Sequence, residues 1–415
     1  GELNECGFVI KVFAGGIYSE YSVSVIEQEG IDEIVKAIEE LVSFQTINKK
    51  QTLKLFEEEA MIESFERSDV GKSYTPDEIL TVLTDLINSY REKYREIINT
   101  SVSLENIKVS KMYLSTKKDL RQHYTWTEGR TFALASKDSN MKYGYDGFGY
   151  SDTEKTIKKL SASLSKSCEL AIMLLDSVLP EPGYYDVITD PSITGLIAHE
   201  AFGHGVEMDM FVKDRALAKE HINKRVASDL VYMHDGAKAT LSNASYFFDD
   251  AGILAQDTLI IEKGILKRGI SDLISALELG TTPTGNSRRE SYKRKAYARM
   301  TNTFFEKGTS KLEDMIKSIE HGYYISITNN GMEDPKNWGI QCTALYGKEI
   351  VGGEFSGKVI SPVVMSGYVI DLLKSISMIS DDFEIIGCGF CGKGYKEWVP
   401  VSDGGPHLKA KVKIG

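Results

Sequence analysis

The chain has 415 residues, of which 42% are apolar and 26% are charged, a composition typical of a soluble globular protein. Its length exceeds that of one average domain and predicts two. A formal net charge of −11 argues against general nucleic-acid binding, which depends on basic residues that neutralise phosphates. No apolar run reaches the ~20 residues of a membrane helix, so we expect no membrane span.

Cysteine usage predicts a reducing compartment. Five cysteines form an odd set without the spacing of a disulfide framework. The sequence also lacks the pattern of a secretory leader. We therefore expect a cytoplasmic protein.

Three amphipathic helices are predicted in the first 180 residues. Apolar residues recur at helical spacing over 31–44, with acidic residues between them. Residues 75–78 read as an N-cap threonine, a proline at the first helical position and a capping-box glutamate. Ser151, with Glu154 three residues later, predicts a second capping box that opens a helix towards Leu175.

Extended segments complete the amino-terminal half and dominate the rest of the chain. Aromatic and β-branched residues predict consecutive antiparallel strands over 107–114, 124–135 and 141–150. The Pro-Glu-Pro-Gly sequence at 180–183 ends the preceding helix and predicts a domain boundary. Asp190 as N-cap and Pro191 at the first position then begin a new helix. Further strands, separated by Gly, Asn and Asp turns, are predicted over 244–248, 258–267, 323–328, 339–346 and 408–414.

These patterns predict an α+β fold with two domains. Residues 1–180 form an amino-terminal α/β domain with antiparallel strands and long helices. Residues 181–415 form a mainly antiparallel β domain that carries the helix after Asp190.

The sequence His199-Glu200-Ala201-Phe202-Gly203-His204 places a carboxylate next to one of two imidazoles. In the HExxH signature, histidines at i and i+4 share one helical face, and the glutamate lies beside a metal-bound water. The spacing here is i, i+5, which turns the second imidazole roughly 140° away in a regular α-helix. Gly203 tolerates backbone angles that other residues resist. We therefore predict a helix that ends, bulges or kinks near Gly203.

Two histidines leave a catalytic metal one protein ligand short, because catalytic zinc typically has three and keeps one position for water. Cys391 is a candidate, since the glycines of 387–392 permit a tight loop. The other candidates are His221, His234, His321, His407, Glu207, Asp209 and the remaining cysteines.

Residues 188–209 resemble the HExxxH segment of the TldD/PmbA metallopeptidase family, and later blocks agree in the family's order. The resemblance is to the TldD side, because the TldE/PmbA side lacks the metal motif. The amino-terminal half is similar only at 129–130 and 144–150. The later blocks are Phe248-Asp249-Asp250-Ala251-Gly252 with 259–266, Thr284-Gly285-Asn286 to Tyr292, Ala298-Arg299-Met300-Thr301-Asn302-Thr303, Cys391-Gly392-Lys393, Val399-Pro400-Val401 and Gly405-Pro406-His407-Leu408-Lys409.

The resemblance implies a ligand set and an activity. It implies His199, His204 and Cys391 as ligands of one divalent metal per chain, a ligand set that favours zinc and leaves iron as the alternative. Glu200 would be the general acid/base in the hydrolysis of short or unfolded peptides. It also implies a TldD/TldE-type dimer, with a second copy or with a metal-free relative. Candidates for substrate or oxyanion contacts are Arg288, Arg289, Tyr292 and Arg299, with His407 as a further contact near the metal.

Other interpretations of these patterns are weaker. Residues 288–299 hold six basic residues and one acid, but in an acidic protein a peptide-carboxylate site or a solvated face is favoured over a phosphate backbone. Residues 387–392 fit GxGxxG without a surrounding βαβ unit, so dinucleotide binding is rejected. The main alternative to a peptidase is a non-catalytic interaction or regulatory protein of the gyrase-modulator type, with a structural metal. Glu200 favours the peptidase, since a structural metal has no use for an adjacent carboxylate.

Overall fold

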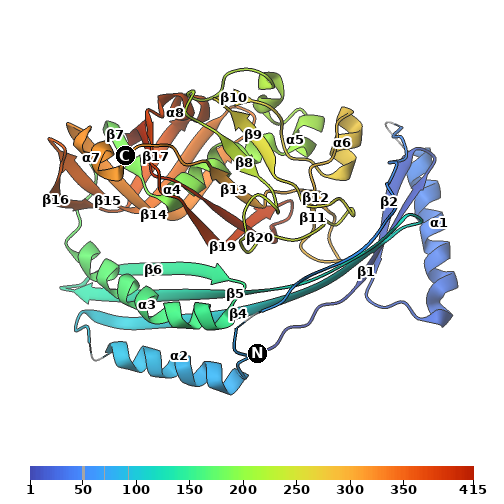
Figure 1. Ribbon diagram of the computed structural model, residues 1–415, viewed down its shortest axis with the longest axis horizontal. Helices are drawn as coiled ribbons and strands as arrows, with labels where there is room; N and C mark the ends of the chain where they lie inside the picture. The colour runs from blue at the N-terminus through green and yellow to red at the C-terminus, as the bar shows by residue number, and fades with distance from the viewer. Residues whose placement is uncertain (49–51, 70, 92) are drawn as a thin grey trace.

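The computed structural model describes residues 1–48, 52–69, 71–91 and 93–415, and it has the predicted α+β fold. Figure 1 shows a long, curved amino-terminal part lying along one side of a β-rich carboxy-terminal part. Within the described ranges, no helix is both long and apolar enough to cross a membrane. The proposed division at residue 180 falls between α3, which ends at Leu175, and β7, which begins at Gly183. That division stays a prediction.

The amino-terminal part is built on three consecutive antiparallel strands, as predicted, and two of them are far longer than the sequence pattern indicated. β5 pairs antiparallel with β4 on one side and β6 on the other, while β3 pairs with β5 in parallel. Helix α3 covers this sheet with Leu160, Leu164 and Cys168, whose side chains are fully buried. The elements are β3 (Met61–Arg67), α2 (Pro76–Arg91), β4 (Ile97–Leu114), β5 (Lys118–Lys137), β6 (Asn140–Tyr150) and α3 (Thr153–Leu175).

The helix caps of this part agree with the sequence in one case and differ in the other. At α2 the Glu78 amide donates to Thr75 Oγ1 at 3.2 Å, and the Thr75 amide donates to a Glu78 oxygen at 2.8 Å, which confirms the capping box. At α3 the N-cap is Asp152 rather than Ser151, because the Asp152 carboxylate accepts the Lys155 amide at 2.9 Å. The predicted box at Ser151 was therefore wrong by one residue.

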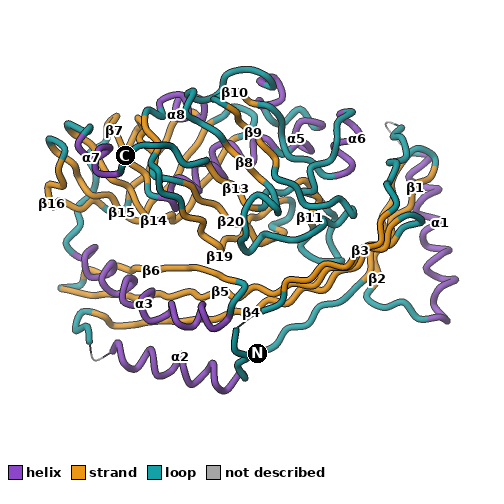
Figure 2. The backbone as a smooth tube through the Cα atoms, viewed as in Figure 1, coloured by secondary structure: helices purple, strands orange, loops and turns teal. Residues whose placement is uncertain are grey.

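A small hairpin module lies at the far end of the long strands (Figure 2). The predicted helix over 31–44 is confirmed as α1, although none of its residues is fully buried. The module consists of β1 (Phe8–Ala14), β2 (Ile17–Val23), η1 (Gln28–Gly30) and α1 (Ile31–Ile47).

The carboxy-terminal part contains two main sheets, of strand order β10-β9-β8-β13-β20-β19 and β14-β7-β21-β17-β15-β16, with β18 paired to β21. Most pairings are antiparallel, as predicted, but β13–β20 and β14–β7 are parallel. The strands are β7 (Gly183–Thr189), β8 (Met233–Asp235), β9 (Thr258–Glu262), β10 (Ile265–Leu266), β11 (Ser287–Arg288), β12 (Tyr297–Ala298), β13 (Asn302–Phe305), β14 (His321–Asp334), β15 (Gly339–Val351), β16 (Glu354–Ile360), β17 (Val363–Tyr368), β18 (Met378–Ile379), β19 (Glu384–Lys393), β20 (Glu397–Gly405) and β21 (Leu408–Ile414).

One predicted strand is absent and another is divided. Residues 244–248 form a loop, because the Gln122 side chain accepts the Phe247 amide at 2.8 Å and donates to the Phe248 carbonyl at 2.9 Å. A side chain from β5 thus satisfies backbone groups that the sequence pattern assigned to a strand. The predicted strand over 258–267 is interrupted by a turn at Lys263 and Gly264, both of which have positive φ.

The main hydrophobic core draws residues from both sheets and from the segment that follows Asp190. Helix α4 (Pro191–Leu196) contacts β20 of one sheet and β14 of the other. Ile193, Ile197 and Phe202 from this segment are at most 1% exposed. The segment is therefore held as a central element of the core. The other short helices are α5 (Met208–Val212), η4 (Leu217–His221), α6 (Leu273–Leu279), α7 (Leu312–Lys317) and α8 (Val369–Ser375).

Asp190→Ala should destabilise this segment. The Asp190 carboxylate accepts the Ile193 amide at 2.8 Å and the Ile327 amide of β14 at 3.2 Å, so its loss removes both a helix cap and a tie to the sheet. We expect the free energy of unfolding to fall by about 1–2 kcal/mol in urea titrations. Asp186→Ala is the control, because Asp186 is half-exposed and makes only a 3.9 Å ion pair with Lys411. Equal effects of the two substitutions would contradict the assigned cap.

Candidate metal centre

The two histidines lie on one side of a π-helical turn. After α4, residues Ile197–Gly203 form the π-helix η2, and the His204 amide donates to the His199 carbonyl. This i→i+5 hydrogen bond absorbs the extra residue in the spacing, because five residues then complete about one turn. The two imidazole centroids are 5.1 Å apart with their planes at 89°. The predicted bulge near Gly203 is confirmed.

Gly203 is needed for space rather than for an unusual backbone angle. Its φ of −60° is accessible to any residue. A Cβ atom at this position would collide with Sδ of Met300, which is fully buried, and would lie 3.1 Å from the Ala198 carbonyl oxygen. The sequence argument from backbone freedom was therefore wrong in its reason, although the break it predicted is present.

Cys391 reaches the histidine pair from a distant hairpin. It lies in β19, opposite Val399 of β20, and its Sγ is 3.6 Å from His204 Nε2. One ligand atom from each of His199, His204 and Cys391 lies within 4.8 Å of the others. His199 and Cys391 are each only 4% exposed. Among the described residues, no other group of three His, Cys, Asp or Glu side chains converges in this way.

Glu200 lies at the open side of the pair. Its Oε2 is 3.9 Å from His204 Nε2, and 19% of its side-chain surface is exposed. Gly331 of β14 leaves room for this side chain, because a Cβ at 331 would lie 2.5 Å from Glu200 Cγ. A carboxylate is thus placed beside the ligand group while remaining accessible to solvent.

Charges within the site favour a thiolate at Cys391. Burial by itself raises the pKa of the Cys391 thiol, but the His204 and His199 imidazoles outweigh burial and hold that pKa well below its ordinary value. For His204 the signs are reversed, because burial by itself lowers the pKa of the imidazole. The nearby Cys391 and Glu207 outweigh burial and raise the pKa of His204 well above its usual range. The thiolate is the form of cysteine that binds metals.

Other candidate ligands lie outside the group and have partners of their own. The His221 ring packs against the Trp338 ring, with centroids 4.5 Å apart and planes inclined at 50°. His234 bonds Asp257 and Glu306, His321 lies 3.6 Å from Glu349, and His407 bonds Asp382 and Tyr324. Cys388, which lies three residues before Cys391, is also outside the group.

The four candidate substrate contacts are not at the histidine pair. Arg288 donates to the carbonyls of Met300 and Pro400 at 2.6 and 2.7 Å. Arg299 is fully buried and donates to the carbonyl of Cys391 at 2.6 Å. Both guanidinium groups thus hold backbone near the cysteine.

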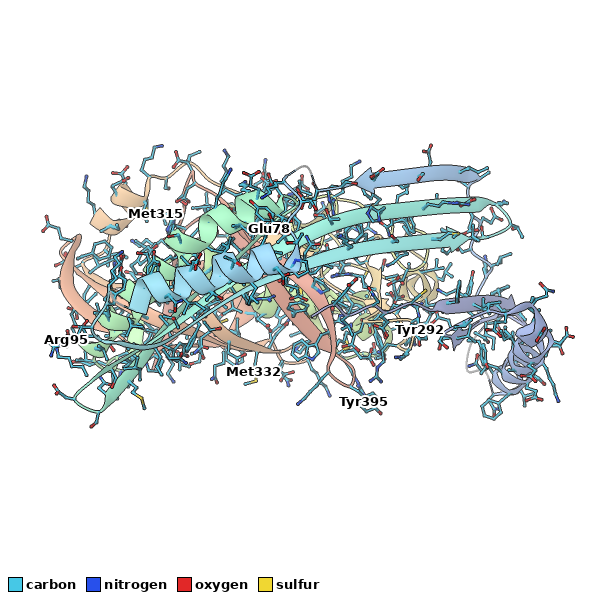
Figure 3. All side chains as sticks on the ribbon, turned by 90° about the horizontal axis from the view of Figure 1, so that it is seen from below. Glu78, Arg95, Tyr292, Met315, Met332 and Tyr395 are labelled. Carbon is cyan, nitrogen blue, oxygen red and sulfur yellow. The ribbon has the colours of Figure 1, made fainter. Side chains whose placement is uncertain are left out.

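Arg289 and Tyr292 instead line a separate cavity of about 560 Å³ beside β1 and β2. Arg289 pairs there with Glu20 at 3.1 Å. Figure 3 shows Tyr292 towards the end of the molecule at which β1 and β2 lie.

Sequence reasoning missed two buried carboxylates that surround the site in other roles. Glu207, considered only as a ligand, accepts the Nδ1 hydrogen of His204 at 3.3 Å. The signal was its position three residues after His204, a spacing that can bring two side chains together across one turn of the chain. Glu333 of β14 has two buried oxygens beside the Gly205 backbone, and burial raises the pKa of this carboxyl group. No sequence signal pointed to Glu333.

The residues present fit a divalent metal. Two imidazoles and a cysteine that favours the thiolate form a donor set that suits zinc. Nδ1 of His199 is buried with no hydrogen-bond partner among the described residues, although an unpaired buried polar atom costs free energy. The fold and this site define a class of protein in which an HExxxH segment on a π-turn faces a cysteine from an antiparallel hairpin.

Comparison with known families shows which family the chain belongs to. Residues 182–415 match the family described as the PmbA/TldA metallopeptidase C-terminal domain. This chain belongs to the PmbA/TldD family, as its sequence motifs predicted. The zinc metalloprotease TldD homolog of Saccharolobus solfataricus is 34% identical over 279 residues, which are 67% of this chain and 59% of that protein. A metalloprotease of Methanocaldococcus jannaschii is 26% identical over 98% of this chain and 90% of its own length.

Solved structures share the fold. TldE from Thermococcus kodakarensis has a TM-score of 0.74 at 20% identity, covering 98% of this chain and 89% of that chain. A Thermotoga maritima protein proposed to be a modulator of a DNA gyrase has a TM-score of 0.77 at 19% identity, covering 98% and 88%. At these identities the likeness concerns the fold alone.

Gly203→Ala should strain the core behind the histidine pair. The added methyl group must displace Met300, and overpacking of this kind typically costs about 1–3 kcal/mol. We expect that loss in the free energy of unfolding measured by urea titration. Gly339→Ala is the matched control, since its Cβ would meet only Asp334 Cβ at 3.9 Å. An unaffected Gly203→Ala protein would refute the packing assigned to Met300.

Cys391→Ser should abolish tight zinc binding, whereas Cys388→Ser should not. The two cysteines lie three residues apart on β19, but only Cys391 belongs to the ligand group. We expect Cys391→Ser to weaken zinc affinity by at least about 100-fold, which exceeds the cost of losing an outer hydrogen-bond partner. Metal analysis after dialysis measures the zinc content of each variant, and competition with a chelator measures its zinc affinity. Equal zinc contents in the two variants would contradict the ligand assignment.

Proposed function

We propose that this protein is a metal-dependent peptidase that hydrolyses short or unfolded peptides. The observation that carries the proposal is the position of Glu200, whose Oε2 lies 3.9 Å from Nε2 of His204, beside three converging ligand side chains. A carboxylate in this place suits proton transfer. The names of the relatives, metalloprotease and zinc metalloprotease, support the same activity.

In this proposal His199, His204 and Cys391 hold one zinc ion per chain. Bound there, the ion supplies Lewis acidity that acidifies a water molecule and polarises a carbonyl group. His204 Nδ1 donates a hydrogen bond to Glu207, so Nε2 of the same ring is the atom left to bind the metal. The thiolate of Cys391 is favoured before the metal arrives, because both imidazoles stabilise its charge.

Glu200 carries the proton in both halves of the reaction. Its Oε2 takes a proton from the attacking water, and the same oxygen then gives the proton to the departing amide nitrogen. Because the side chain is 19% exposed, it can meet both water and a bound peptide. Gly331 contributes by leaving the space in which this carboxylate sits.

We propose that Arg288 and Arg299 act by fixing the backbone around Cys391. Each is committed to backbone carbonyls, so neither guanidinium is free for a peptide in this conformation. Arg289 and Tyr292 line the cavity beside β1 and β2, where they are placed for contact with a more distant part of a peptide. The donor that stabilises the oxyanion is not among the four candidates in this arrangement.

We further propose that the chain works in the cytoplasm as a TldD/TldE-type dimer, either with a second copy or with a metal-free relative. The shared fold with TldE supports this assembly. The odd cysteine set, of which Cys168, Cys342 and Cys391 are buried, fits a reducing compartment. The acidic net charge gives no support to direct nucleic-acid binding.

Glu200→Gln should abolish peptide cleavage while leaving the metal in place. Glutamine keeps the size of the side chain but does not accept the proton, so we expect the cleavage rate to fall by about 10²–10⁴-fold. The measurements are cleavage of an unfolded peptide substrate and zinc content of the same preparations.

Glu220→Gln is the matched control, because Glu220 is exposed on η4 and does not belong to the ligand group. A Glu200→Gln protein that kept its zinc and cut peptides at the wild-type rate would refute the mechanism. It would favour the alternative of an interaction protein with a structural metal.

A further inference from the structure

Lys393 is a buried cation whose three donors are all used. Its Nζ donates to Glu207 Oε2 at 3.0 Å, to Asp209 Oδ1 at 2.7 Å and to the Ala298 carbonyl at 2.9 Å. An ammonium group has three N–H bonds, so this set is complete. Only 13% of the Lys393 side-chain surface is exposed. Such a fixed ammonium group can hold its neighbours in place.

The partners of Lys393 connect it to His204. Glu207 Oε2 accepts from Lys393 and from His204 Nδ1, so one carboxylate oxygen joins the ammonium to the imidazole. In the neutral form that binds a metal, a histidine whose Nδ1 hydrogen is engaged presents the lone pair of Nε2, the atom that lies 3.6 Å from Cys391 Sγ. Outer hydrogen bonds of this kind commonly orient metal-binding histidines.

Lys393 also belongs to the strand that carries the cysteine. It lies two residues after Cys391 in β19, and side chains at i and i+2 of a strand point to the same face. Cys391 and His204 are 187 residues apart in the chain. Through Glu207, the ammonium therefore ties the cysteine strand directly to the histidine segment.

The charges around this tie are nearly balanced. Lys393 and Arg299 face Glu207 and Asp209, and the second oxygen of Asp209 pairs with Lys213 at 3.2 Å. Lys213 differs from Lys393 because 47% of its side-chain surface is exposed. Removal of Lys393 therefore takes away the one ammonium group that contacts both Glu207 and Asp209, whereas removal of Lys213 leaves both of those contacts in place.

We propose that Lys393 and Glu207 are positioning residues that fix the orientation of His204 and hold Cys391 beside it. They build the ligand group before the metal binds. The inference rests on the proposed function, because it concerns the same metal site.

The test measures zinc affinity of the metal-free protein by competition with a chromophoric chelator. Lys393→Met and Glu207→Gln should each weaken zinc binding by about 10–100-fold. Because both act through one hydrogen-bonded chain, the double variant should lose less than the product of the two single losses. Lys213→Met, which removes the exposed partner of the same Asp209, should keep wild-type affinity.

A second variant separates positioning from folding. Lys393→Met combined with Asp209→Asn removes the tie but keeps the net charge, so it guards against unfolding caused by an unpaired carboxylate. Melting temperatures of the metal-free proteins measure any general loss of stability. With Co²⁺ as the probe, the thiolate-to-cobalt absorption band should weaken in this variant, because Cys391 is no longer held beside His204.

Three outcomes decide the proposal. Weaker zinc binding and a weaker cobalt–thiolate band, at an unchanged melting temperature of the metal-free protein, support positioning. Wild-type zinc affinity in folded Lys393→Met or in the combined variant overturns it, even if the melting temperature falls. If the wild-type chain itself binds no zinc in the competition assay, the proposed function fails, and that result is distinct from a failure of the positioning role alone.

Discussion

The hydrogen bond from the His204 amide to the His199 carbonyl is the constraint on which the site depends. A regular α-helix would turn the two imidazoles apart, whereas this π-turn places them on one side. The segment that contains the turn is held at its start by the Asp190 cap of α4, and the turn ends at Gly203, on which Met300 packs. A helix of the core is thus underwound at one point, and the surrounding packing keeps it so.

The fold could be predicted from sequence wherever local signals agree with tertiary packing. Asp190 with Pro191 marks its helix correctly, and the strand predicted over 408–414 has the observed bounds, because it alternates buried and exposed residues next to clear turns. The prediction failed at 244–248, where Gln122 of β5 satisfies the backbone instead. That partner is more than a hundred residues away, and local periodicity contains no information about it.

The candidate site, too, could be predicted from the sequence only in part. The spacing of two histidines and one glutamate gave the chemistry and predicted the break in the helix. Cys391 stood out through its glycines and the family resemblance, but only folding shows it 3.6 Å from His204. Arg299 carried a basic charge that sequence could assign to substrate, yet its guanidinium holds the Cys391 carbonyl. Lys393 belongs to the Cys391-Gly392-Lys393 block, but the sequence gives it no role, because its role follows from contacts with Glu207 and Asp209.

The central claim is that one metal is held by two imidazoles and one thiolate. The histidines and the cysteine lie far apart in the sequence and are brought together by the fold. X-ray absorption at the zinc edge of the purified, zinc-loaded protein tests it most directly. The account predicts one zinc per chain with one sulfur ligand at about 2.3 Å and imidazole nitrogens at about 2.0–2.1 Å. A metal shell without sulfur, in a protein that retains its zinc, would contradict the account.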